Sequence, residues 1–430
     1  LVRAPQPGRP RALAPRSVVH LVHGYPPWDI GGTELYAQGL VTAQRRHREV
    51  AVYARVGRPD RATGEVIEAV DHGVRIRRTV NNFTQRDPLA RNGLFDRGLA
   101  LDFGRFLDDV RPELVHVHHL AGHAANLPRE AQRRGLPLLF QLQDWWPLCA
   151  RINLTRPDNS LCPGPQPDRC AACRPLTAAP LNRLLHLLRR RAFGRALALA
   201  DGFVAGSQFI VESYRAAGLL AADRPVWVSP YGVAALPLRP LAPRPPVTKP
   251  VRFGFVGALM PHKGPHVLIE AMRRLTPGAA TLTLWGDPEA APEYAALLRQ
   301  AAAGLPIRFA GAFAEADRGQ VFAAMDLLVI PSIGLESFGL VAREAFAAGV
   351  PVIAADRGAL SEIFAGATAA GRLVAPDDVA ALAGALADFA AEPERIDASR
   401  NAMPAVRDHA EHAAEIETIY QELLARRRAP

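Results

Sequence analysis

The feature that most restricts the fold of this chain is a regular alternation of short apolar runs with helical patterns, which occurs twice. In the first half, VVHLVH (18–23) and EVAVYARV (49–56) are typical of buried strands, and GGTELYAQGLVTAQRRH (31–47) between them has helical periodicity. The alternation starts again with the strand pattern VRFGFVG (251–257) and continues to the helical DVAALAGALADFAAE (378–392). Strands that alternate with helices indicate an α/β fold with doubly wound parallel sheets, so we expect two Rossmann-like domains.

A proline-rich segment separates the two halves. Residues 237–250 contain six prolines, which exclude a helix interior or a central strand and indicate a linker. We expect an N-terminal domain over residues 16–236 and a C-terminal domain over 251–404, followed by an amphipathic helix over 405–430. Residues 1–15 are rich in proline and arginine without periodicity, and we expect a disordered arm there.

Composition and charge exclude several classes of protein. The chain has 430 residues, of which 49% are hydrophobic and 22% charged, so it is not wholly disordered. No run approaches the roughly 18 apolar residues of a membrane span, and the start shows no secretory signal, so we expect a cytoplasmic protein. The net charge of +9 permits contact with nucleic acid, an anionic membrane or phosphorylated substrates. Because no aromatic–basic RNA-binding motif is present, we expect no nucleic-acid partner.

The segment IPSIGLESFGLVAREAFAAGVPVIAADRGALSEI (330–363) contains the strongest chemical signal. A loop after the first strand carries Glu336, and the following helix carries Glu344. A carboxylate at Glu344 suits the two hydroxyls of a ribose. The alternative is that both glutamates are ordinary solvated residues, as most glutamates are. The helix is expected to begin near Phe338, which would leave three amides free to bind a diphosphate: those of Ser337, Phe338 and Gly339.

The same segment resembles the E-x7-E signature of retaining glycosyltransferases of family 4. FVGALMPHKGPHVLIEAM (255–272) is similar to the V-G-R-L-x-x-x-K-G-x-x-x-L-I-x-A segment of that family, and VSPYGV (228–233) to its I-P-N-G-V turn. In the first half, the glycine pair before a helix, HVHH (116–119) and QLQDWWPLC (141–149) also resemble family motifs. The resemblance covers nearly the whole chain from Ser17.

This resemblance implies a GT-B fold, in which two Rossmann-like domains face a central cleft and a C-terminal helix crosses back to the N-terminal domain. The C-terminal domain would bind a nucleotide-diphosphate sugar, and the N-terminal domain a glycan, a lipid-linked or a small-molecule acceptor. The implied reaction retains the anomeric configuration, with the leaving phosphate accepting the proton of the acceptor. No D-x-D motif is present, so we expect transfer without a metal ion.

The resemblance also assigns roles to single residues. Lys263 would stabilise the departing diphosphate, since phosphate departure requires fixed positive charge. The expected catalytic residues are His118, Lys263 and Glu336. The expected donor-binding residues are Gly32, Gly257, Lys263, Gly264, Ser337, Phe338, Gly339 and Glu344. On the acceptor side we expect Gly31, Gly32 and Asp144.

One departure from the family pattern lies at Ala258, where the family usually has an arginine. Of the two cationic side chains that contact the donor phosphates in the family, only the lysine is then present. The loss of one charge-assisted contact weakens donor binding by about 1.5–3 kcal/mol. The arginines considered as replacements are Arg252, Arg343 and Arg357.

Three histidines stand at one strand end. Alternation along a strand places His116 and His118 on one face and His119 on the other, so all three cannot line one site. The resemblance implies that His118 contacts the transferred sugar. The alternative is that all three are ordinary strand-end histidines.

All four cysteines of the chain lie within 25 residues. The C-x2-C end of the pattern and the four thiols suit a structural Zn²⁺, while reduced thiols or two disulfides are the alternatives. The expected ligands are Cys149, Cys162, Cys170 and Cys173. The loop that contains them has no hydrophobic period, so it needs a staple to be ordered.

Two further alternatives concern partners and function. The basic, leucine-rich helix at 181–200 would suit an anionic membrane surface, but we favour a core-packed helix with a solvated arginine face. The competing functions are a non-catalytic or weakly active GT-B protein that binds a carbohydrate or a nucleotide, a nucleotide-sugar epimerase and a phosphorylase. A dehydrogenase is disfavoured because GYPPWDIGG replaces G-x-G-x-x-G after the first strand.

Overall fold

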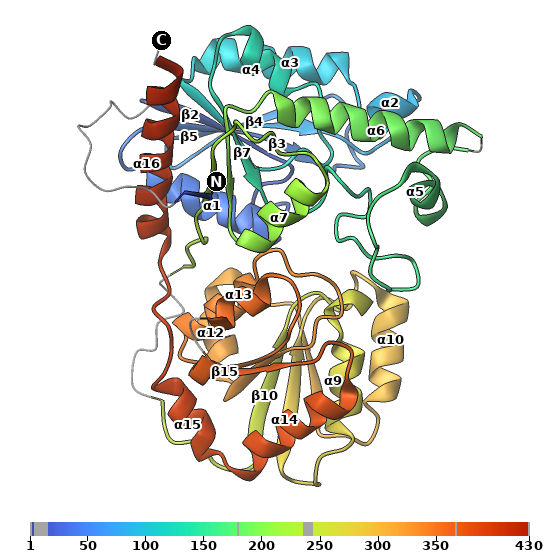
Figure 1. Ribbon diagram of the computed structural model, residues 1–430, viewed down its shortest axis with the longest axis vertical. Coiled ribbons are helices and arrows are strands. Elements are labelled where there is room, and N and C mark those ends of the chain that lie inside the picture. The colour runs from blue at the N-terminus through green and yellow to red at the C-terminus, as the bar shows by residue number, and fades with distance from the viewer. Residues whose placement is uncertain (1, 4–15, 179, 235–243, 366–367, 429–430) are drawn as a thin grey trace. The chain divides into compact units, whose positions relative to one another are not determined.

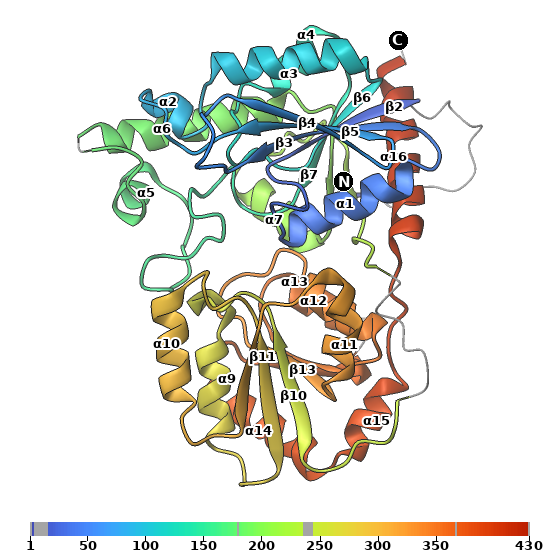
Figure 2. The same cartoon turned by 180° about the vertical axis from the view of Figure 1, so that it is seen from behind.

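The structure is a computed structural model, and it describes residues 2–3, 16–178, 180–234, 244–365 and 368–428. The chain divides into two compact units, each an α/β fold (Figures 1 and 2). Unit 1 comprises Leu1–Leu154, Cys162–Gly232 and His409–Pro430, and unit 2 comprises Thr155–Leu161 and Val233–Asp408. The boundary expected at 236–237 falls outside the described residues. The structure also assigns the short segment 155–161 to unit 2 instead of the N-terminal domain.

Unit 1 contains a sheet whose described strands are all parallel to their neighbours except one. Its order is β1-β9-β8-β7-β6-β2-β3-β5-β4, and only β4 runs antiparallel, in a hairpin with β5. The strands are β1 (Val2–Arg3), β2 (Ser17–Val22), β3 (Glu49–Val56), β4 (Val66–Asp71), β5 (Val74–Val80), β6 (Leu114–Val117), β7 (Leu138–Leu142), β8 (Gly202–Ala205) and β9 (Val226–Val228). The helices are α1 (Gly32–Gln44), α2 (Pro88–Arg91), α3 (Arg97–Val110), α4 (Pro128–Arg133), α5 (Pro167–Cys173), α6 (Leu181–Ala198), α7 (Gln208–Ala216) and α16 (His409–Arg428).

Two features of unit 1 differ from the expectation. Val2–Arg3 pairs with β9, so the N-terminal arm is not unstructured at these two residues, while residues 4–15 lie outside the described part. Strand β4 was not expected, because most of its side chains are exposed and it therefore has no alternating apolar face.

Unit 2 contains a second sheet, which is wholly parallel over the described residues, in the order β12-β11-β10-β13-β14-β15. Its strands are β10 (Val251–Val256), β11 (Ala280–Trp285), β12 (Ile307–Gly311), β13 (Leu327–Ile330), β14 (Val352–Ala355) and β15 (Gly371–Val374). Its α-helices are α9 (Pro265–Met272), α10 (Pro292–Ala301), α11 (Arg318–Ala323), α12 (Leu340–Ala347), α13 (Ala359–Ala365), α14 (Val379–Ala391) and α15 (Glu394–Arg400). The 3-10 turns are η1 (Pro261–Lys263), η2 (Glu315–Asp317) and η3 (Thr368–Ala370).

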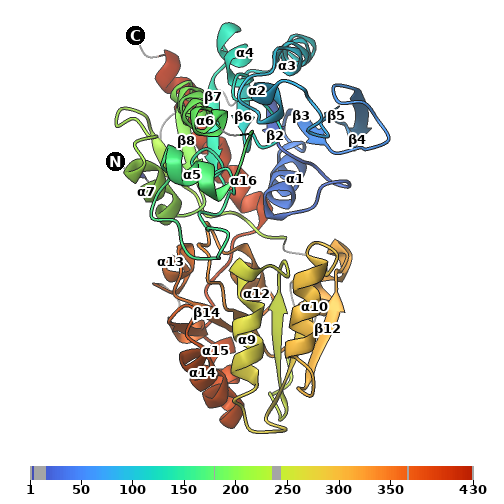
Figure 3. The same cartoon turned by 90° about the vertical axis from the view of Figure 1, so that its right-hand side faces the viewer.

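Strand alternation builds a core on each face of the unit 2 sheet. Leu327 and Val329 of β13 belong to the cluster that α9 and α14 cover, whereas Leu328 and Ile330 belong to the cluster under α12 and α13. Figure 3 shows α9 beside α10 on the first of these faces. Because both faces are covered, the strands consist of nearly continuous apolar residues, as expected for a buried parallel sheet.

The C-terminal helix returns to unit 1, as the resemblance implied. It begins at His409, later than the expected residue 405, and packs against α1 (Figure 1). Ile416, Ile419 and Leu423 of α16 are buried. The Tyr420 hydroxyl also hydrogen-bonds His116 Nδ1 at 2.8 Å inside the core.

None of the helices in the described ranges combines the length and the apolar character that crossing a bilayer requires. Helix α6 buries one face, including Leu185 and Phe193, in unit 1. This packing fits the core-packed alternative for the leucine-rich segment, although Leu181 and Leu184 at its amino end are exposed.

Candidate functional site

The carboxyl ends of β10 and β13 bring a lysine and a glutamate together in unit 2. Lys263, at the end of η1, places Nζ 2.8 Å from Glu336 Oε1. The hydroxyl of Ser332 donates to the same carboxylate oxygen at 2.6 Å. Ligands of open parallel sheets bind beyond the carboxyl ends of the strands, so the pair lies where a ligand is expected.

The charge of this pair is fixed by its surroundings. Burial alone would raise the pKa of Glu336, but the Lys263 ammonium and the two hydrogen bonds lower it below its usual range. The Lys263 side chain is 31% exposed and that of Glu336 14%. The carboxylate is therefore held inside, while the ammonium keeps a face open to an anionic ligand.

Two glycines hold the backbone around this pair. At Gly264, φ is +70°, and a Cβ there would lie 2.0 Å from the carbonyl oxygen of Pro331. At Gly358, φ is +64°, and a Cβ would lie 2.4 Å from the carbonyl oxygen of Glu336. That same carbonyl accepts the Ala359 amide at 2.8 Å. Only glycine fits either position without displacing the loop that carries Glu336.

Helix α12 begins later than the sequence predicted. Gly339 is its N-cap, with φ +74°, and Leu340 is the first helical residue. The backbone amides that lack an intrahelical acceptor thus start at Gly339 and continue through Leu340 and Val341, rather than starting at Ser337. The phenyl ring of Phe338 is buried in the core, with 4% of the residue exposed.

The second glutamate of the motif lies one turn into this helix, and its carboxylate is already engaged. Arg318 Nη1 donates to both oxygens of Glu344 at 2.9 Å, and its guanidinium also binds Glu315. Burial raises the pKa of Glu344 to about 7; Arg318 opposes this rise and Glu315 adds to it. Arg318 was missed from the sequence, because an arginine in a chain rich in arginine gives no signal.

Three arginines were considered as replacements for the family arginine that is missing at exposed Ala258. They lie in different parts of unit 2. Arg252 lies at the amino end of β10 and is bound to Asp326 at 2.7 Å, so it cannot reach the carboxyl ends of the strands. Arg343 lies on α12, with its guanidinium 4.5 Å from the centroid of the Phe338 ring. It forms no ion pair in the described part of the chain, and burial lowers its pKa to about 10. Of Arg252 and Arg343, the latter is thus the better placed candidate; Arg357 precedes Gly358, whose backbone lies against Glu336. Gly257, just before Ala258, directly follows β10.

Unit 1 carries a second polar group at the carboxyl ends of its strands. His23 follows β2, His119 follows β6 and Asp144 follows β7. His119 Nε2 lies 2.9 Å from Asp144 Oδ2, and His23 Nε2 lies 2.9 Å from Glu34 Oε1 on α1. The two imidazole rings are 4.2 Å apart. Two histidine–carboxylate pairs therefore lie side by side at this edge of the sheet.

The glycine pair before α1 belongs to the same place. Gly31 is the N-cap of α1, and a Cβ there would lie 2.7 Å from Glu34 Oε2. Gly32, its neighbour, is the first residue of the helix. Gly31 thus leaves room for the Glu34 carboxylate that binds His23.

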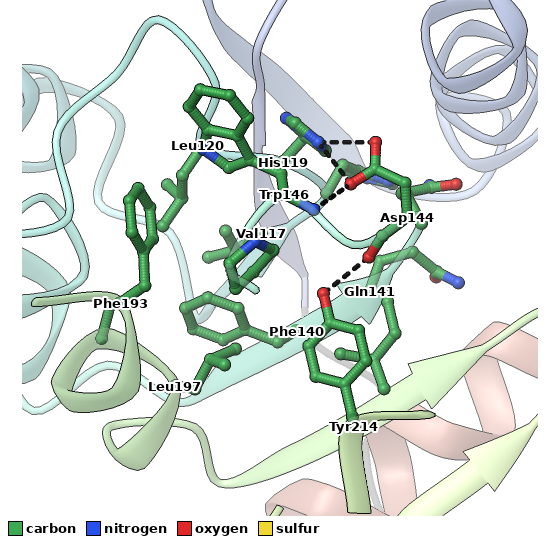
Figure 4. A pocket seen from close by; sticks show the side chains of 15 residues that line it. Val117, His119, Leu120, Phe140, Gln141, Asp144, Trp146, Phe193, Leu197 and Tyr214 are labelled. Carbon is green, nitrogen blue, oxygen red and sulfur yellow. Dashed lines mark hydrogen bonds and ion pairs between the residues drawn. The ribbon is translucent and has the colours of Figure 1, made fainter. Parts of the chain in front are cut away.

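Asp144 is held from three sides (Figure 4). Its side chain accepts the Trp146 amide at 2.7 Å in addition to His119, and its carbonyl accepts the Tyr214 hydroxyl at 2.7 Å. Burial would raise the pKa of Asp144, but His119 and the Trp146 amide lower it. A small cavity beside it is lined mainly by apolar side chains, among them Phe140, Phe193 and Leu197.

His118 is also among the residues that line this cavity, but its ring contacts other histidines. Its ring is 1% exposed, stacks on His116 at 4.2 Å and hydrogen-bonds His20 through Nε2 at 2.8 Å. Burial and the neighbouring imidazoles hold its pKa well below its usual range. The predicted division of the histidines between two faces agrees with this geometry. The predicted contact of His118 with a sugar stays a prediction; in this structure the ring is buried against His20 and His116.

The sequence could have indicated the missed residues of this site. His23 directly follows the last residue of a strand and His119 follows one residue later, and such positions share one edge of a parallel sheet. Glu34 is less visible, since it is one charged residue among several in a helix.

Comparison with known proteins matches both halves of the chain. The model described as glycosyl transferases group 1 matches residues 250–392, and that of Glycosyltransferase Family 4 matches residues 30–234. The D-inositol 3-phosphate glycosyltransferase of Actinosynnema mirum is 30% identical over 367 residues, which are 77% of each chain. The enzyme of the same name from Corynebacterium efficiens is 37% identical over 180 residues, which are 39% of this chain and 42% of that protein. The match thus spans about two fifths of the length of the latter.

Two solved structures show the same fold. Sucrose-phosphate synthase from Thermosynechococcus elongatus has a TM-score of 0.69 at 20% identity, over 96% of this chain and 100% of that one. HepE of Anabaena, in complex with UDP and glucose, has a TM-score of 0.64 at 18% identity, over 96% and 99% of the two chains.

Proposed function

Because the chain belongs to the group 1 and family 4 glycosyltransferases and has their GT-B fold, we propose that it transfers a sugar from a nucleoside diphosphate sugar to a hydroxyl group. The transfer retains the anomeric configuration and requires no metal ion at the reacting centre. Its donor site lies in unit 2 and its acceptor site in unit 1.

The observation that carries this proposal is the Lys263–Glu336 pair beside the start of α12. When the sugar departs from the diphosphate, negative charge develops on the β-phosphate, and the fixed ammonium of Lys263 stabilises it. The amides of Leu340 and Val341 point the positive end of the helix dipole at the same group. Glu336, ionised and held by Ser332, accepts hydrogen bonds from the sugar hydroxyls.

We propose that His119, held by Asp144, takes the place near the transferred sugar that the resemblance gave to His118. The Asp144 carboxylate fixes the orientation of the imidazole, which lies at the strand end rather than in the core. A neutral imidazole there can hydrogen-bond a sugar hydroxyl. The proton of the acceptor goes to the leaving phosphate, since no protein base is required for a front-face substitution.

Two names among the similar proteins suggest where the search for substrates begins. HepE binds UDP and glucose, so UDP-sugars are the first donors to test. Phosphorylated polyols are the first acceptors, given the enzyme of Actinosynnema mirum. A lipid-linked acceptor would need contact with a membrane surface. The exposed Leu181 and Leu184 of α6 are the residues through which we would test vesicle binding.

The experiment measures release of the nucleoside diphosphate from UDP-, GDP- and ADP-sugars, with and without acceptors, and binding of the diphosphates by calorimetry. We expect one nucleotide to bind, and Lys263→Met to lower turnover by about 100-fold or more, as for loss of one oxyanion stabiliser. Lys249→Met, which replaces the other lysine of the chain, is the matched control and should leave turnover unchanged. Binding of a nucleotide without turnover of any donor sugar would favour the non-catalytic alternative. Binding of no nucleotide would reject the donor site.

A further inference from the structure

The four cysteines predicted to bind zinc lie on α5 and in the loop before it. All four are half-buried, and none forms a disulfide. Among the described residues, the group that brings three possible metal-ligand atoms within 4.8 Å of one another consists of His20, His116 and His118 instead. Zinc at the cysteines therefore stays a prediction.

A different group of side chains stands at the carboxyl edge of the unit 1 sheet. Strands β2, β3 and β5 are parallel neighbours, so the segments that follow them meet at the same edge. Trp28 and Asp29 follow β2, Arg55 lies near the end of β3, and Phe83 follows β5. We call these four residues, together with Arg78 of β5, the aromatic–arginine group.

Printed contacts between the side chains bring this group together. The Arg55 guanidinium lies 5.1 Å from the centroid of the Phe83 ring, and its Nη1 lies 3.8 Å from Asp29 Oδ1. The Arg78 guanidinium lies 4.8 Å from the centroid of the Trp28 ring. Because Trp28 and Asp29 are consecutive in the chain, both arginines contact one short segment.

Arg58, on the loop after β3, links the two aromatic residues. Its guanidinium lies 5.5 Å from the centroid of the Trp28 ring. Its amide donates to the side-chain oxygen of Asn82, the neighbour of Phe83, at 2.8 Å. The guanidinium is already bound to both carboxylate oxygens of Asp60, at 2.9 and 2.7 Å. Arg58 therefore connects the group without offering a free guanidinium.

The guanidiniums of Arg55 and Arg78, in contrast, have few acceptors. Within the described ranges, the Arg55 side chain donates no hydrogen bond, and its contact with Asp29 is long. Arg78 is 3% exposed, forms no ion pair among the described residues and donates one hydrogen bond, to the carbonyl oxygen of Pro26 at 2.6 Å. The Nε atoms of both arginines and Asp29 Oδ2 are buried without a partner. Such unmatched buried groups are costly unless a ligand satisfies them.

The backbone is shaped to hold this arrangement. At Gly122, φ is +69°, and a Cβ there would lie 2.4 Å from Arg55 Cδ, so the glycine makes room for the arginine. Phe83 has a φ of +57°, which is uncommon for a bulky residue. Its amide donates to Asn81 Oδ1 at 2.8 Å, which holds the turn. The chain thus accepts an unfavourable conformation to keep the Phe83 ring beside Arg55.

The chemistry of the group suits a sugar that carries an anion. Trp28 and Phe83 are each 46% exposed, and an aromatic face is the kind of surface on which the apolar C–H face of a pyranose ring packs. The Arg55 side chain is 20% exposed, and a guanidinium binds phosphate or carboxylate through paired N–H groups. The Asp29 carboxylate can accept a sugar hydroxyl.

The group also adjoins the polar pairs described above. A Cβ at Gly24 would lie 2.7 Å from Asp29 Cβ and 3.0 Å from Glu34 Oε1, so these two side chains flank the same glycine. Glu34 holds His23 at 2.9 Å. A ligand on the aromatic–arginine group therefore lies next to the proposed acceptor site.

We propose that the aromatic–arginine group binds the acceptor, and that the acceptor is a pyranoside with a phosphate or carboxylate substituent. The sugar ring packs on Trp28, the anion binds Arg55, and a hydroxyl donates to Asp29. This inference rests on the sugar transfer proposed above and names the class of acceptor for it.

The test compares acceptors with the donor sugar that the protein turns over. The anionic acceptors are glucose 6-phosphate, a glucuronide and a polyprenyl diphosphate glucose, and the matched neutral acceptor is methyl glucoside. We expect at least one anionic acceptor to have a lower KM than methyl glucoside. Which one it is distinguishes a free phosphate, a carboxylate and a lipid-linked diphosphate as the source of the charge.

Variants locate the effect. Arg55→Gln should raise the KM of the anionic acceptor at least about tenfold, as for loss of a charged hydrogen bond, and leave its kcat and the KM of methyl glucoside unchanged. Trp28→Ala should raise the KM of both kinds of acceptor. Arg75→Gln is the matched control, because Arg75 stands at the other end of β5, paired with Glu68 at 3.2 Å, and it should change neither KM.

In case Arg55→Gln folds poorly, Arg55→Lys keeps the charge without the paired N–H groups, and its KM should lie between those of the wild type and Arg55→Gln. A KM for methyl glucoside equal to or below that of every anionic acceptor would overturn the inference. So would an unchanged KM in Arg55→Gln.

Binding of the nucleoside diphosphate separates this failure from that of the proposed function. If the nucleotide binds and no anionic acceptor binds or reacts, the inference is wrong and the donor site stands. If no nucleotide binds, the proposed function fails as well.

Discussion

Glu344 differs from most carboxylates of the chain in its burial and in its single cationic partner. It is buried, and it receives both of its short contacts from one guanidinium, that of Arg318. With a pKa of about 7, it changes charge within the pH range in which an enzyme is assayed. An ionised carboxylate accepts hydrogen bonds from hydroxyls more strongly than a neutral one does.

This titration predicts a pH dependence of nucleoside binding. Between pH 6 and pH 8 the ionised fraction of Glu344 rises from roughly a tenth to roughly nine tenths, so affinity should increase about tenfold. The ligand is the nucleoside of the preferred diphosphate, because it has no phosphate that titrates in this range. Calorimetry at the two pH values measures the effect.

The Glu344→Gln variant is the control for this measurement. A glutamine does not titrate, so its affinity should be the same at both pH values. An equal increase in the variant and the wild type would assign the pH dependence to another group and remove Glu344 from the ribose site.

At the scale of elements, α16 is attached to unit 1 by buried hydrogen bonds as well as by apolar packing. His412 Nε2 lies 2.9 Å from the Tyr36 hydroxyl of α1, and the Glu422 carboxylate accepts the Trp227 indole N–H at 3.0 Å. The Tyr420 hydroxyl reaches His116 in the middle of the sheet. The helix therefore supplies partners to polar groups that would otherwise be buried alone.

We expect Tyr420→Phe to lower the free energy of unfolding of unit 1 by about 1–3 kcal/mol, since it leaves a buried histidine nitrogen without its partner. Thr418→Ala, on a less buried position of the same helix, should change it by less than about 0.5 kcal/mol. Urea unfolding followed by tryptophan fluorescence is a suitable measurement, because four of the five tryptophans lie in unit 1. Equal stability of Tyr420→Phe and wild type would show that the hydrogen bond contributes nothing.

How accurately the sequence predicts the structure also differs between secondary-structure elements. The buried parallel strand β3 was placed to the residue, because its apolar run is bounded by turns. The exposed strand β4 was missed, because it has no buried face. Lys263 and Glu336 were each named from their motifs, but their contact with one another was not, and neither Arg318 nor the His23–Glu34 pair was named. Pairing between side chains distant in sequence follows from the packed fold, which no local pattern encodes.

At the scale of the whole molecule, the two units respond differently to acid. His20 and His123 in unit 1 have pKa values lowered to about 3 by burial, and those of His116 and His118 are also lowered. Between pH 6.5 and 3 the unfolded state therefore binds more protons than the folded state, and the stability of unit 1 falls as pH falls. In unit 2, the raised pKa of Glu344 has the opposite sign and favours the folded state below pH 7.

We thus expect acidification from pH 7 to pH 5 to destabilise unit 1 by about 2 kcal/mol for each fully buried histidine. Calorimetric melting at both pH values, with hydrogen exchange to assign the transitions, measures this. The His20→Gln variant should lose less stability than the wild type over the same interval. If unit 1 melted at the same temperature at both pH values, the buried histidines would not be the groups that make its stability depend on pH.

The return of α16 to unit 1 has a consequence for the newly made chain. A ribosome that has delivered residues up to Asp408 has produced all of unit 2, but unit 1 still lacks its final helix. Until α16 is synthesised, His116 Nδ1 and the Trp227 indole N–H lack the hydrogen-bond partners that this helix supplies, and the groove that Ile416 and Ile419 will fill is open to water. Unit 1, whose first strands are synthesised before unit 2, is therefore completed last. Until then, the groove for α16 must be shielded from water by other contacts.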